Sequence, residues 1–180
     1  RYAEAETENR EVLSTQTQVL GAEHPDTLRT RHHLADVLRK QGRYAEAETE
    51  NRAVLATRSQ VLGAEHPDTL RTRNNLAEVL RQQGRYAEAE TEFRQALVAL
   101  TRILGAEHPD TLLARHNLAN VFRDQGRYAE AETEFRQVLV ALTRILGAEH
   151  PDTLLARHNL ANILDSQGRY SEAETEYRKM

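Results

Sequence analysis

The segment Gly-Ala-Glu-His-Pro-Asp-Thr-Leu, residues 21–28, recurs unchanged from residues 63, 105 and 147, which gives the chain a period of 42 residues. The tripeptide Gly-Arg-Tyr recurs with the same period from residues 42, 84, 126 and 168. All eight glycines and all four prolines belong to these repeated segments. One supersecondary unit is therefore copied along the chain. We expect a single array over residues 1–180, with no separate catalytic domain.

The composition fits such an array and disfavours several classes of partner. With 39% hydrophobic and 5% aromatic residues, we expect a thin core of Ala and Leu, buried only where neighbouring units meet. A formal net charge of -4 argues against a broad surface for nucleic acid. No apolar run is long enough to cross a membrane, so no membrane partner is expected. The absence of cysteine favours a cytoplasmic location.

Each repeat predicts two helices separated by a glycine. The first runs from about Pro25 to Gln41, because proline suits the first position of a helix and Gly42 suits the left-handed position after its end. The second runs from about Tyr44 to Leu62. No segment shows the alternation of apolar and polar residues that is typical of a strand.

The two-residue link between these helices predicts an antiparallel hairpin. The expected fold is therefore an all-α, right-handed solenoid of antiparallel helix pairs. Its expected parts are a single helix at residues 1–20, repeats at residues 24–62, 66–104 and 108–146, and a truncated repeat at residues 150–180.

The first helix of each repeat has two stripes of side chains at helical spacing. Leu28, Leu34, Ala35 and Leu38 form the stripe expected to pack, and Arg31 lies on the same stripe. An unpaired buried charge would be costly, so we expect the stem of this arginine to pack while its guanidinium meets a carboxylate or carbonyl at the helix seam. The same role is expected of its equivalents Arg73, Arg115 and Arg157.

Several recurring residues carry a resemblance to a known family. In the first full repeat they are Leu34, Ala35, Leu38, Gly42, Tyr44, Ala47 and Leu55. This pattern resembles the tetratricopeptide repeat, although its usual period is about 34 residues. The 42-residue period and the Asn-Asn-Leu-Ala string at residues 74–77 are similar to the long repeats of kinesin light chains. Similar arrays are found at the C-termini of bacterial and fungal NLR-like regulators. The resemblance implies a protein-binding or peptide-binding class of function.

The resemblance also implies a concave groove lined mainly by the first helix of each repeat. The positions that map onto it are Arg29, His32, His33, Asp36, Arg71, Asn74, Asn75, Glu78, Leu113, His116, Asn117, Asn120, Leu155, His158, Asn159 and Asn162. By the same resemblance, Asn75, Asn117 and Asn159 would hydrogen-bond the backbone of a bound peptide, whereas His33 departs from the pattern. The alternative is that these asparagines bond a neighbouring helix and order the stack.

Neither a metal site nor a catalytic site is expected. His24, His66, His108 and His150 each precede Pro-Asp at a helix start, where a capping or turn role explains them. Equivalent histidines lie one repeat apart, roughly 10 Å, which is too far to share an ion. The sequence has no Gly-rich phosphate loop, no Gly-x-Ser-x-Gly elbow and no cysteine nucleophile, so we expect neither a cofactor nor an enzyme.

The repeats form two similar pairs. Residues 1–42 differ from 43–84 at eight positions, and residues 85–126 differ from 127–168 at five. Between the pairs, Asn9 and Asn51 become Phe93 and Phe135, Gln16 and Arg58 become Leu100 and Leu142, and Arg29 and Arg71 become Leu113 and Leu155. The C-terminal pair is expected to pack better and to present an apolar groove, so the N-terminal pair should open first on heating.

The sequence therefore predicts a non-catalytic scaffold that binds a protein or peptide in its concave groove. One alternative makes the array the sensing arm of an NLR-like switch ATPase. Another makes it an assembly element that self-associates end to end. The near-identity of the repeats indicates either recent duplication or deliberate design.

Overall fold

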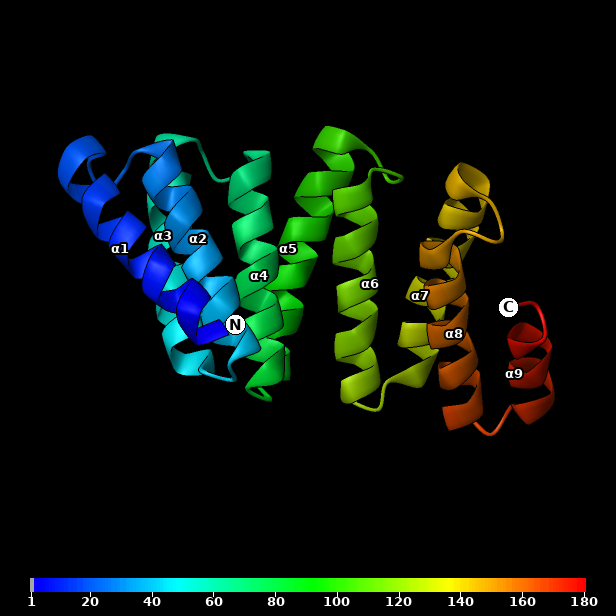
Figure 1. Ribbon diagram of the computed structural model, residues 1–180. Helices are drawn as coiled ribbons and strands as arrows, with labels where there is room; N and C mark the ends of the chain where they lie inside the picture. Colours follow the sequence, from blue (N-terminus) through cyan, green and yellow to red (C-terminus); the bar gives the residue numbers. More distant parts are fainter. Residues whose placement is uncertain (1) are drawn as a thin grey trace. The chain divides into compact units, whose positions relative to one another are not determined.

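The computed structural model describes residues 2–180 (Figure 1). Within this range the backbone forms nine α-helices and no strand. The helices are α1 (Tyr2–Leu20), α2 (Pro25–Lys40), α3 (Tyr44–Val61), α4 (Pro67–Gln82), α5 (Tyr86–Leu104), α6 (Pro109–Asp124), α7 (Tyr128–Leu146), α8 (Pro151–Ser166) and α9 (Tyr170–Tyr177). The helix boundaries predicted for the first full repeat, Pro25–Gln41 and Tyr44–Leu62, agree with α2 and α3 to within one residue. The first residue of the predicted helix 1–20 lies outside the described residues.

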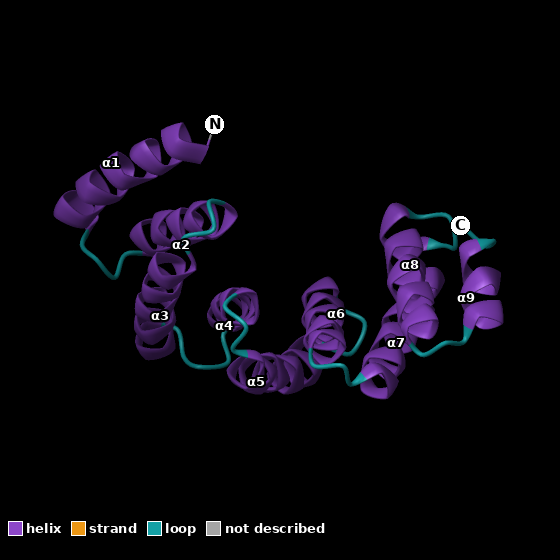
Figure 2. Cartoon of the chain, turned by 90° about the horizontal axis from the view of Figure 1, so that it is seen from below, coloured by secondary structure: helices purple, strands orange, loops and turns teal. Residues whose placement is uncertain are grey.

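The chain divides into two compact units, Arg1–Leu100 and Thr101–Met180, called here the N-terminal and C-terminal units. In the N-terminal unit α1, α2, α3 and α4 pack in chain order, and α2 also contacts α4. In the C-terminal unit α6, α7, α8 and α9 pack in the same way. Figure 2 shows the short loops that connect these successive helices. The all-α solenoid of antiparallel helix pairs predicted from the sequence is confirmed in each unit.

The repeated His-Pro-Asp segments cap the helices that follow them. His24 precedes α2 with an extended backbone, and its Nδ1 accepts a hydrogen bond from the backbone N–H of Asp26 at 3.2 Å. The same contact occurs before α4, α6 and α8. This bond satisfies a backbone donor that the first helical turn leaves unpaired. The predicted capping role of these four histidines is confirmed.

The glycine after α2 ends that helix. Gly42 has φ +78°, and its N–H bonds the carbonyl of Arg39 at 3.0 Å. The N–H of Arg43 then reaches the carbonyl of Leu38 at 3.0 Å. These bonds satisfy carbonyls that the last turn leaves free, and the positive φ explains the glycine.

The arginine on the packing stripe joins the two helices of each repeat. It forms an ion pair with a glutamate of the next helix, at N···O distances of 3.1 Å for Arg31–Glu50, 2.6 Å for Arg73–Glu92, 2.7 Å for Arg115–Glu134 and 2.8 Å for Arg157–Glu176. The predicted structural role of this arginine, with a carboxylate as its partner, is confirmed.

The core is made mostly of Ala and Leu, as predicted from the composition. In the N-terminal unit Leu34, Leu38, Ala47 and Val79 form a buried cluster. In the C-terminal unit Phe135 is fully buried on α7. The equivalent position of α3 holds buried Asn51, whose Nδ2 donates to the carbonyl of Ala47 at 2.9 Å. Helices α3 and α7 therefore fill the same core position with an amide and with an aromatic ring, and α5 has buried Phe93 there.

Candidate functional site

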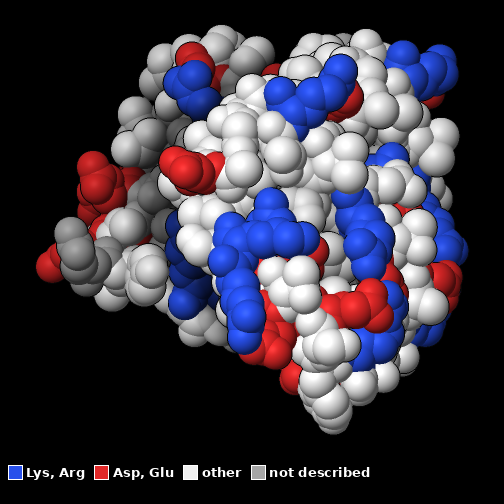
Figure 3. Space-filling view, turned by 90° about the vertical axis from the view of Figure 1, so that its right-hand side faces the viewer, with Lys and Arg blue, Asp and Glu red and all other residues white. Residues whose placement is uncertain are grey.

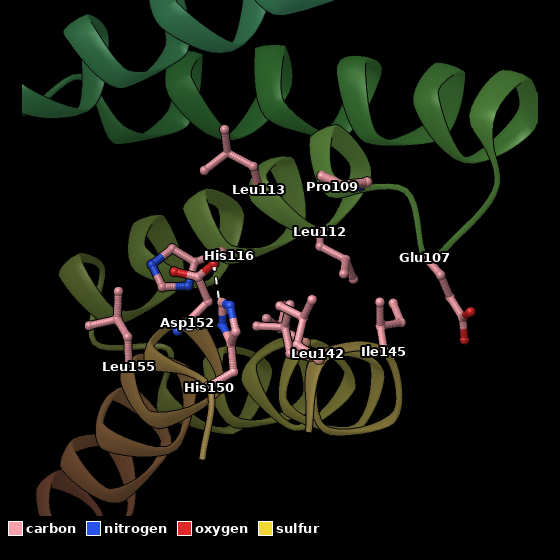
Figure 4. Close-up of a pocket in the computed structure, with 12 residues that line it drawn as sticks. Glu107, Pro109, Leu112, Leu113, His116, Leu142, Ile145, His150, Asp152 and Leu155 are labelled. Carbon is pink, nitrogen blue, oxygen red and sulfur yellow. Dashed lines mark hydrogen bonds and ion pairs between the residues drawn. The ribbon is translucent and has the colours of Figure 1, made fainter. Parts of the chain in front are cut away.

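The C-terminal unit contains a cavity of about 530 Å³ formed by α6, α7 and α8, together with the loops before α6 and α8 (Figure 4). We call it the Leu142 cavity. Its aliphatic lining consists of Leu112, Leu113, Val138, Leu142, Ile145, Leu146 and Leu155. Its other lining residues are Glu107, Pro109, His116, His150 and Asp152. Leu113 and Leu155 are 53% and 54% exposed, so two leucines are open to solvent beside a largely aliphatic interior.

The polar groups at the edge of the Leu142 cavity are engaged with their own neighbours. His150 Nδ1 accepts from the N–H of Asp152 and lies 3.8 Å from Asp152 Oδ2, the contact drawn as a dashed line in Figure 4. The ring of His116 packs edge-on against Phe135, with centroids 5.4 Å apart. The arrangement therefore favours an apolar guest more than a charged one.

The N-terminal unit has an equivalent cavity of about 480 Å³ formed by α2, α3 and α4. We call it the Arg58 cavity. Its lining consists of Glu23, Pro25, Asp26, Leu28, Arg29, His32, His33, Arg58, Val61, Leu62, Asp68 and Arg71. The three arginines of this lining lie at positions where the Leu142 cavity has leucines: Arg29 corresponds to Leu113, Arg58 to Leu142 and Arg71 to Leu155. Two ion pairs lie at this cavity, Arg29–Asp26 at 2.9 Å and Arg71–Asp68 at 3.0 Å.

His32 connects the first helices of two repeats. Its Nε2 lies 3.0 Å from Nδ2 of Asn75 on α4. Burial lowers the pKa of His32 to about 4, and the charges of Arg58 and His33 act in the same direction. His32 is therefore neutral at neutral pH, and Nε2 can accept the amide proton. Asn75 therefore contacts a neighbouring helix in the structure. Such a contact is the alternative to peptide binding that the sequence leaves open.

The predicted groove residues fall into several groups. Those that line a cavity are Arg29, His32, His33 and Arg71 in the N-terminal unit, and Leu113, His116 and Leu155 in the C-terminal unit. Those that are half-buried outside both cavities include Asn117, Asn120 and Asn159. Near the end of the chain, Asn162 Oδ1 accepts a hydrogen bond from the Tyr177 hydroxyl, and the His158 ring lies 5.9 Å from the Tyr177 ring.

Two acidic positions of the predicted groove are held by cations of their own helices. Asp36 pairs with Arg39 and Lys40, each at 2.7 Å. Burial raises the pKa of Asp36, but the hydrogen bonds from Lys40 and Arg39 outweigh that effect and lower it. Glu78 pairs with Arg81 at 2.8 Å in the next repeat. Both carboxylates are therefore partly neutralised within α2 and α4.

Asn74 is one of the predicted groove residues, and its side chain is buried in the structure. Only 4% of this residue is exposed, and its Oδ1 is buried without a hydrogen-bond partner among residues 2–180. The equivalent histidines at positions 116 and 158 lie against an aromatic ring of the following helix. The position therefore faces the seam between two helices, and the shorter asparagine does not extend from that seam to the surface.

Sequence reasoning missed the contribution of the second helix of each repeat. Arg58 on α3 and Val138, Leu142, Ile145 and Leu146 on α7 line the two cavities. The signal in the sequence is the change from Arg58 to Leu142, from which we predict better packing. Leu142 is half-buried at a cavity, so this change alters the chemistry of a concave surface.

Charges of both signs lie side by side on the face of the molecule that Figure 3 draws. Figure 3 shows Lys and Arg groups beside Asp and Glu groups on the face that includes the C-terminal helices. In the part of the chain that the structure describes, no three His, Asp or Glu side chains are arranged to hold a metal ion. None of the helices described above combines the length and the apolar character needed to cross a membrane.

Comparison with known proteins agrees with this architecture. The sequence model of the tetratricopeptide repeat family matches residues 1–56, 30–97, 68–139 and 110–179. The chain belongs to the tetratricopeptide repeat family. The predicted resemblance is thus confirmed for this tetratricopeptide repeat (TPR) array.

Solved structures share the fold of this TPR array. A Podosopora anserina protein, described as a kinesin light chain with nearly identical TPR-like repeats, has 29% identity and a TM-score of 0.82, covering 99% of this chain and 84% of that chain. Bacillus thuringiensis PlcR, solved with the peptide PapR7 and DNA, has 18% identity and a TM-score of 0.72, covering 97% and 63%. A Rap protein, complexed with Competence and Sporulation Factor, has 16% identity and a TM-score of 0.74, covering 86% and 41%. No curated protein sequence is a significant match.

Proposed function

We propose that this TPR array is a non-catalytic binding module that holds an extended peptide, with one apolar side chain of the peptide in the Leu142 cavity. The observation that carries the proposal is the cavity itself: about 530 Å³ of mainly aliphatic lining, with Leu113 and Leu155 exposed beside it. Its volume lies within the range of pockets that hold small ligands. Burial of one large apolar side chain contributes about 1.5–3 kcal/mol, enough to select for such a residue.

The half-buried amides of the C-terminal unit supply the polar part of the proposal. An amide side chain offers both a donor and an acceptor to a peptide backbone without adding charge. Asn117 and Asn159 are proposed to make such contacts, with Asn120, His158 and Asn162 also belonging to the surface. Asn75 is the weaker candidate, because its amide already lies 3.0 Å from His32 Nε2.

The comparisons support the class of ligand. PlcR was solved with a peptide, and the Rap protein was solved with Competence and Sporulation Factor. Both proteins share only the fold with this chain, so the identity of its own peptide has to come from experiment.

The test is selection of random peptides displayed on phage against the whole chain, followed by affinity measurement with synthetic copies of the selected peptides. Leu142→Arg places in the cavity the residue found at the equivalent position 58. Val140→Arg is the matched control, because Val140 is exposed on the same helix and does not line the Leu142 cavity. We expect selected peptides to share an apolar residue and to bind Leu142→Arg at least tenfold more weakly, while Val140→Arg binds normally.

Two results would contradict the proposal: no enrichment of any peptide, or equal binding of the selected peptides by the parent and by folded Leu142→Arg. Circular dichroism checks the fold of each variant. The sensing-arm and self-association alternatives remain predictions. Light scattering that increases more steeply than concentration would favour self-association.

A further inference from the structure

Arg58 is a buried cation at the base of the Arg58 cavity. Only 8% of it is exposed. Its Nη1 donates to the Thr72 hydroxyl at 2.8 Å and to the backbone carbonyl of Asp68 at 3.1 Å. Both acceptors are neutral, and within residues 2–180 Arg58 forms no ion pair with a carboxylate. The Asp68 carboxylate pairs with Arg71, and its charge also acts on Arg58, where it opposes the effect of burial on the pKa.

This arrangement differs from that of the seam arginines, each of which has a glutamate partner. Arg31, Arg73, Arg115 and Arg157 are all neutralised in this way. A buried charge without a directly bonded counter-ion is costly, and burial lowers the pKa of Arg58 although the charge of Asp68 acts in the opposite direction. An anion from outside the chain would supply a directly bonded counter-charge.

Two further arginines lie at the same cavity and are more exposed. Arg29 and Arg71 have side chains 67% and 50% exposed, and each pairs with an aspartate three residues earlier on its own helix. Exposed pairs of this kind contribute little to stability, so a ligand can compete for these guanidinium groups. The cavity thus combines one fixed buried cation with two movable ones.

The polar set is replaced as a whole in the C-terminal unit. Arg58 becomes Leu142, and Thr72, which accepts its hydrogen bond, becomes Ala156. Arg29 and Arg71 become Leu113 and Leu155. The Thr72 hydroxyl accepts a hydrogen bond from Arg58, so a hydroxyl is not needed at position 156, where position 142 holds leucine in place of that arginine. The four positions therefore behave as one polar constellation in the N-terminal unit and as one apolar surface in the other.

We infer that the Arg58 cavity binds an oxyanion, a carboxylate or a phosphate group, with Arg58 as the fixed cation and Arg29 and Arg71 as the closing cations. The planar guanidinium matches the paired oxygens of either group. Arg58 has no directly bonded counter-ion, which suits a single anionic group, and the cavity of about 480 Å³, whose lining also includes Glu23, Asp26 and Asp68, has room for it. This site lies in the N-terminal unit and does not depend on peptide binding in the Leu142 cavity.

The test titrates the whole chain separately with inorganic phosphate and with acetate at constant ionic strength, and follows backbone and arginine side-chain resonances by NMR. We expect saturable shifts confined to α2, α3 and α4. Arg58→Leu should weaken binding at least tenfold. Arg52→Leu is the matched control, since it removes one exposed arginine of the same helix that does not line the cavity, and should bind normally.

Stronger binding of phosphate than of acetate assigns the site to phosphate groups, and the reverse assigns it to carboxylates. Short blocked peptides that carry phosphoserine or glutamate then separate a peptide-borne group from a free anion by their relative affinity. The inference is overturned if neither anion gives saturable shifts, or if folded Arg58→Leu binds as the parent does. If Arg58→Leu does not fold, the double variant Arg29→Leu, Arg71→Leu decides, and unchanged binding by it overturns the inference.

Discussion

The Arg58 cavity and the Leu142 cavity are built from the same backbone elements and differ in the side chains that give them their chemistry. Each cavity is formed by the first helices of two successive repeats and by the second helix that lies between them in the chain. The earlier of the two first helices starts at a His-Pro-Asp cap. Arg29, Arg58 and Arg71 line one of them. Leucines stand at the equivalent positions of the other. The repeat fixes where a cavity forms, while the side chains at these three positions and at position 72 or 156 set the chemistry of the cavity.

The largest expected effect is on the free energy of unfolding and concerns the core position that holds Phe135 on α7 and Asn51 on α3. Phe135→Ala should lower the free energy of unfolding of the C-terminal unit by about 3–5 kcal/mol, because it empties a fully buried ring site. Asn51→Ala at the equivalent position should cost only about 1 kcal/mol, since it removes one modest hydrogen bond. Chemical denaturation followed by amide exchange in α3 and α7 measures both. Equal losses would show that the two cores do not differ as described.

The second effect is a pH dependence confined to the N-terminal unit. The folded state lowers the pKa of His32 from 6.5 to about 4, so the unfolded chain takes up a proton first as the pH falls. Stability from neutral His32 is therefore present above pH 6.5 and is lost between pH 6.5 and about 4, by at most about 3 kcal/mol. His32→Asn, the residue found at position 74, should remove this dependence.

The measurement is the free energy of unfolding of α2 and α3 across that pH range, with the His32 titration followed by NMR. The nearby charges of Arg58, His33, Asp36 and Arg71 also act on this imidazole, the Asp36 charge in the opposite sense from the other three. A pKa of His32 near 6.5 in the folded chain would contradict the account of its burial.

A third effect is the difference in local opening between the two units. Helix α3 carries buried Asn51 and Arg58 where α7 carries Phe135 and half-buried Leu142. We expect the slowest amides of α3 to exchange about tenfold faster than those of α7, equivalent to about 1.4 kcal/mol. Native-state hydrogen exchange measures the ratio. Slower exchange in α3 would reverse the expected order of stability.

The smallest effect is on the stability of the Arg58 cavity without a ligand. Replacing a buried cation that has no directly bonded counter-ion with an apolar residue is often stabilising, so Arg58→Leu combined with Thr72→Ala should raise the free energy of unfolding by about 1 kcal/mol. Arg52→Leu should change it by less than about 0.5 kcal/mol. Denaturation in buffer free of phosphate and carboxylate tests this. A marked destabilisation by the double change would mean that Arg58 chiefly supports the fold.

The fold could be predicted from the sequence alone because each repeat contains residues that mark where its helices begin and end. The His-Pro-Asp cap, the glycine after each first helix and the 42-residue period together determine the order and the bounds of the helices. The structural role predicted for the seam arginines is confirmed as well. These features are local, since each depends on residues within one or two helical turns or one hairpin.

The candidate site was less predictable because it depends on contacts between repeats. Helical spacing placed Asn74 on an outward stripe, but its short side chain lies buried at the helix seam. The family pattern places the groove on the first helices, so the change from Arg58 to Leu142 on the second helices predicts better packing and no site. The contact between His32 and Asn75 joins residues in successive repeats and has no signature in a single unit. Such features follow from how units stack.

The most direct test of the central claim converts one cavity into the other. The variant Arg29→Leu, Arg58→Leu, Arg71→Leu, Thr72→Ala gives the N-terminal unit the four residues of the C-terminal unit. Parent and variant, labelled with ¹⁵N and with ¹³C at methyl groups, are each titrated with inorganic phosphate and with isobutanol and followed by NMR. The account predicts that the variant loses phosphate-dependent shifts in α2–α4 and gains isobutanol-dependent shifts there, while the Leu142 cavity responds to isobutanol in both proteins. A folded variant whose responses to both probes match those of the parent would contradict the claim that these positions set the chemistry of the cavity.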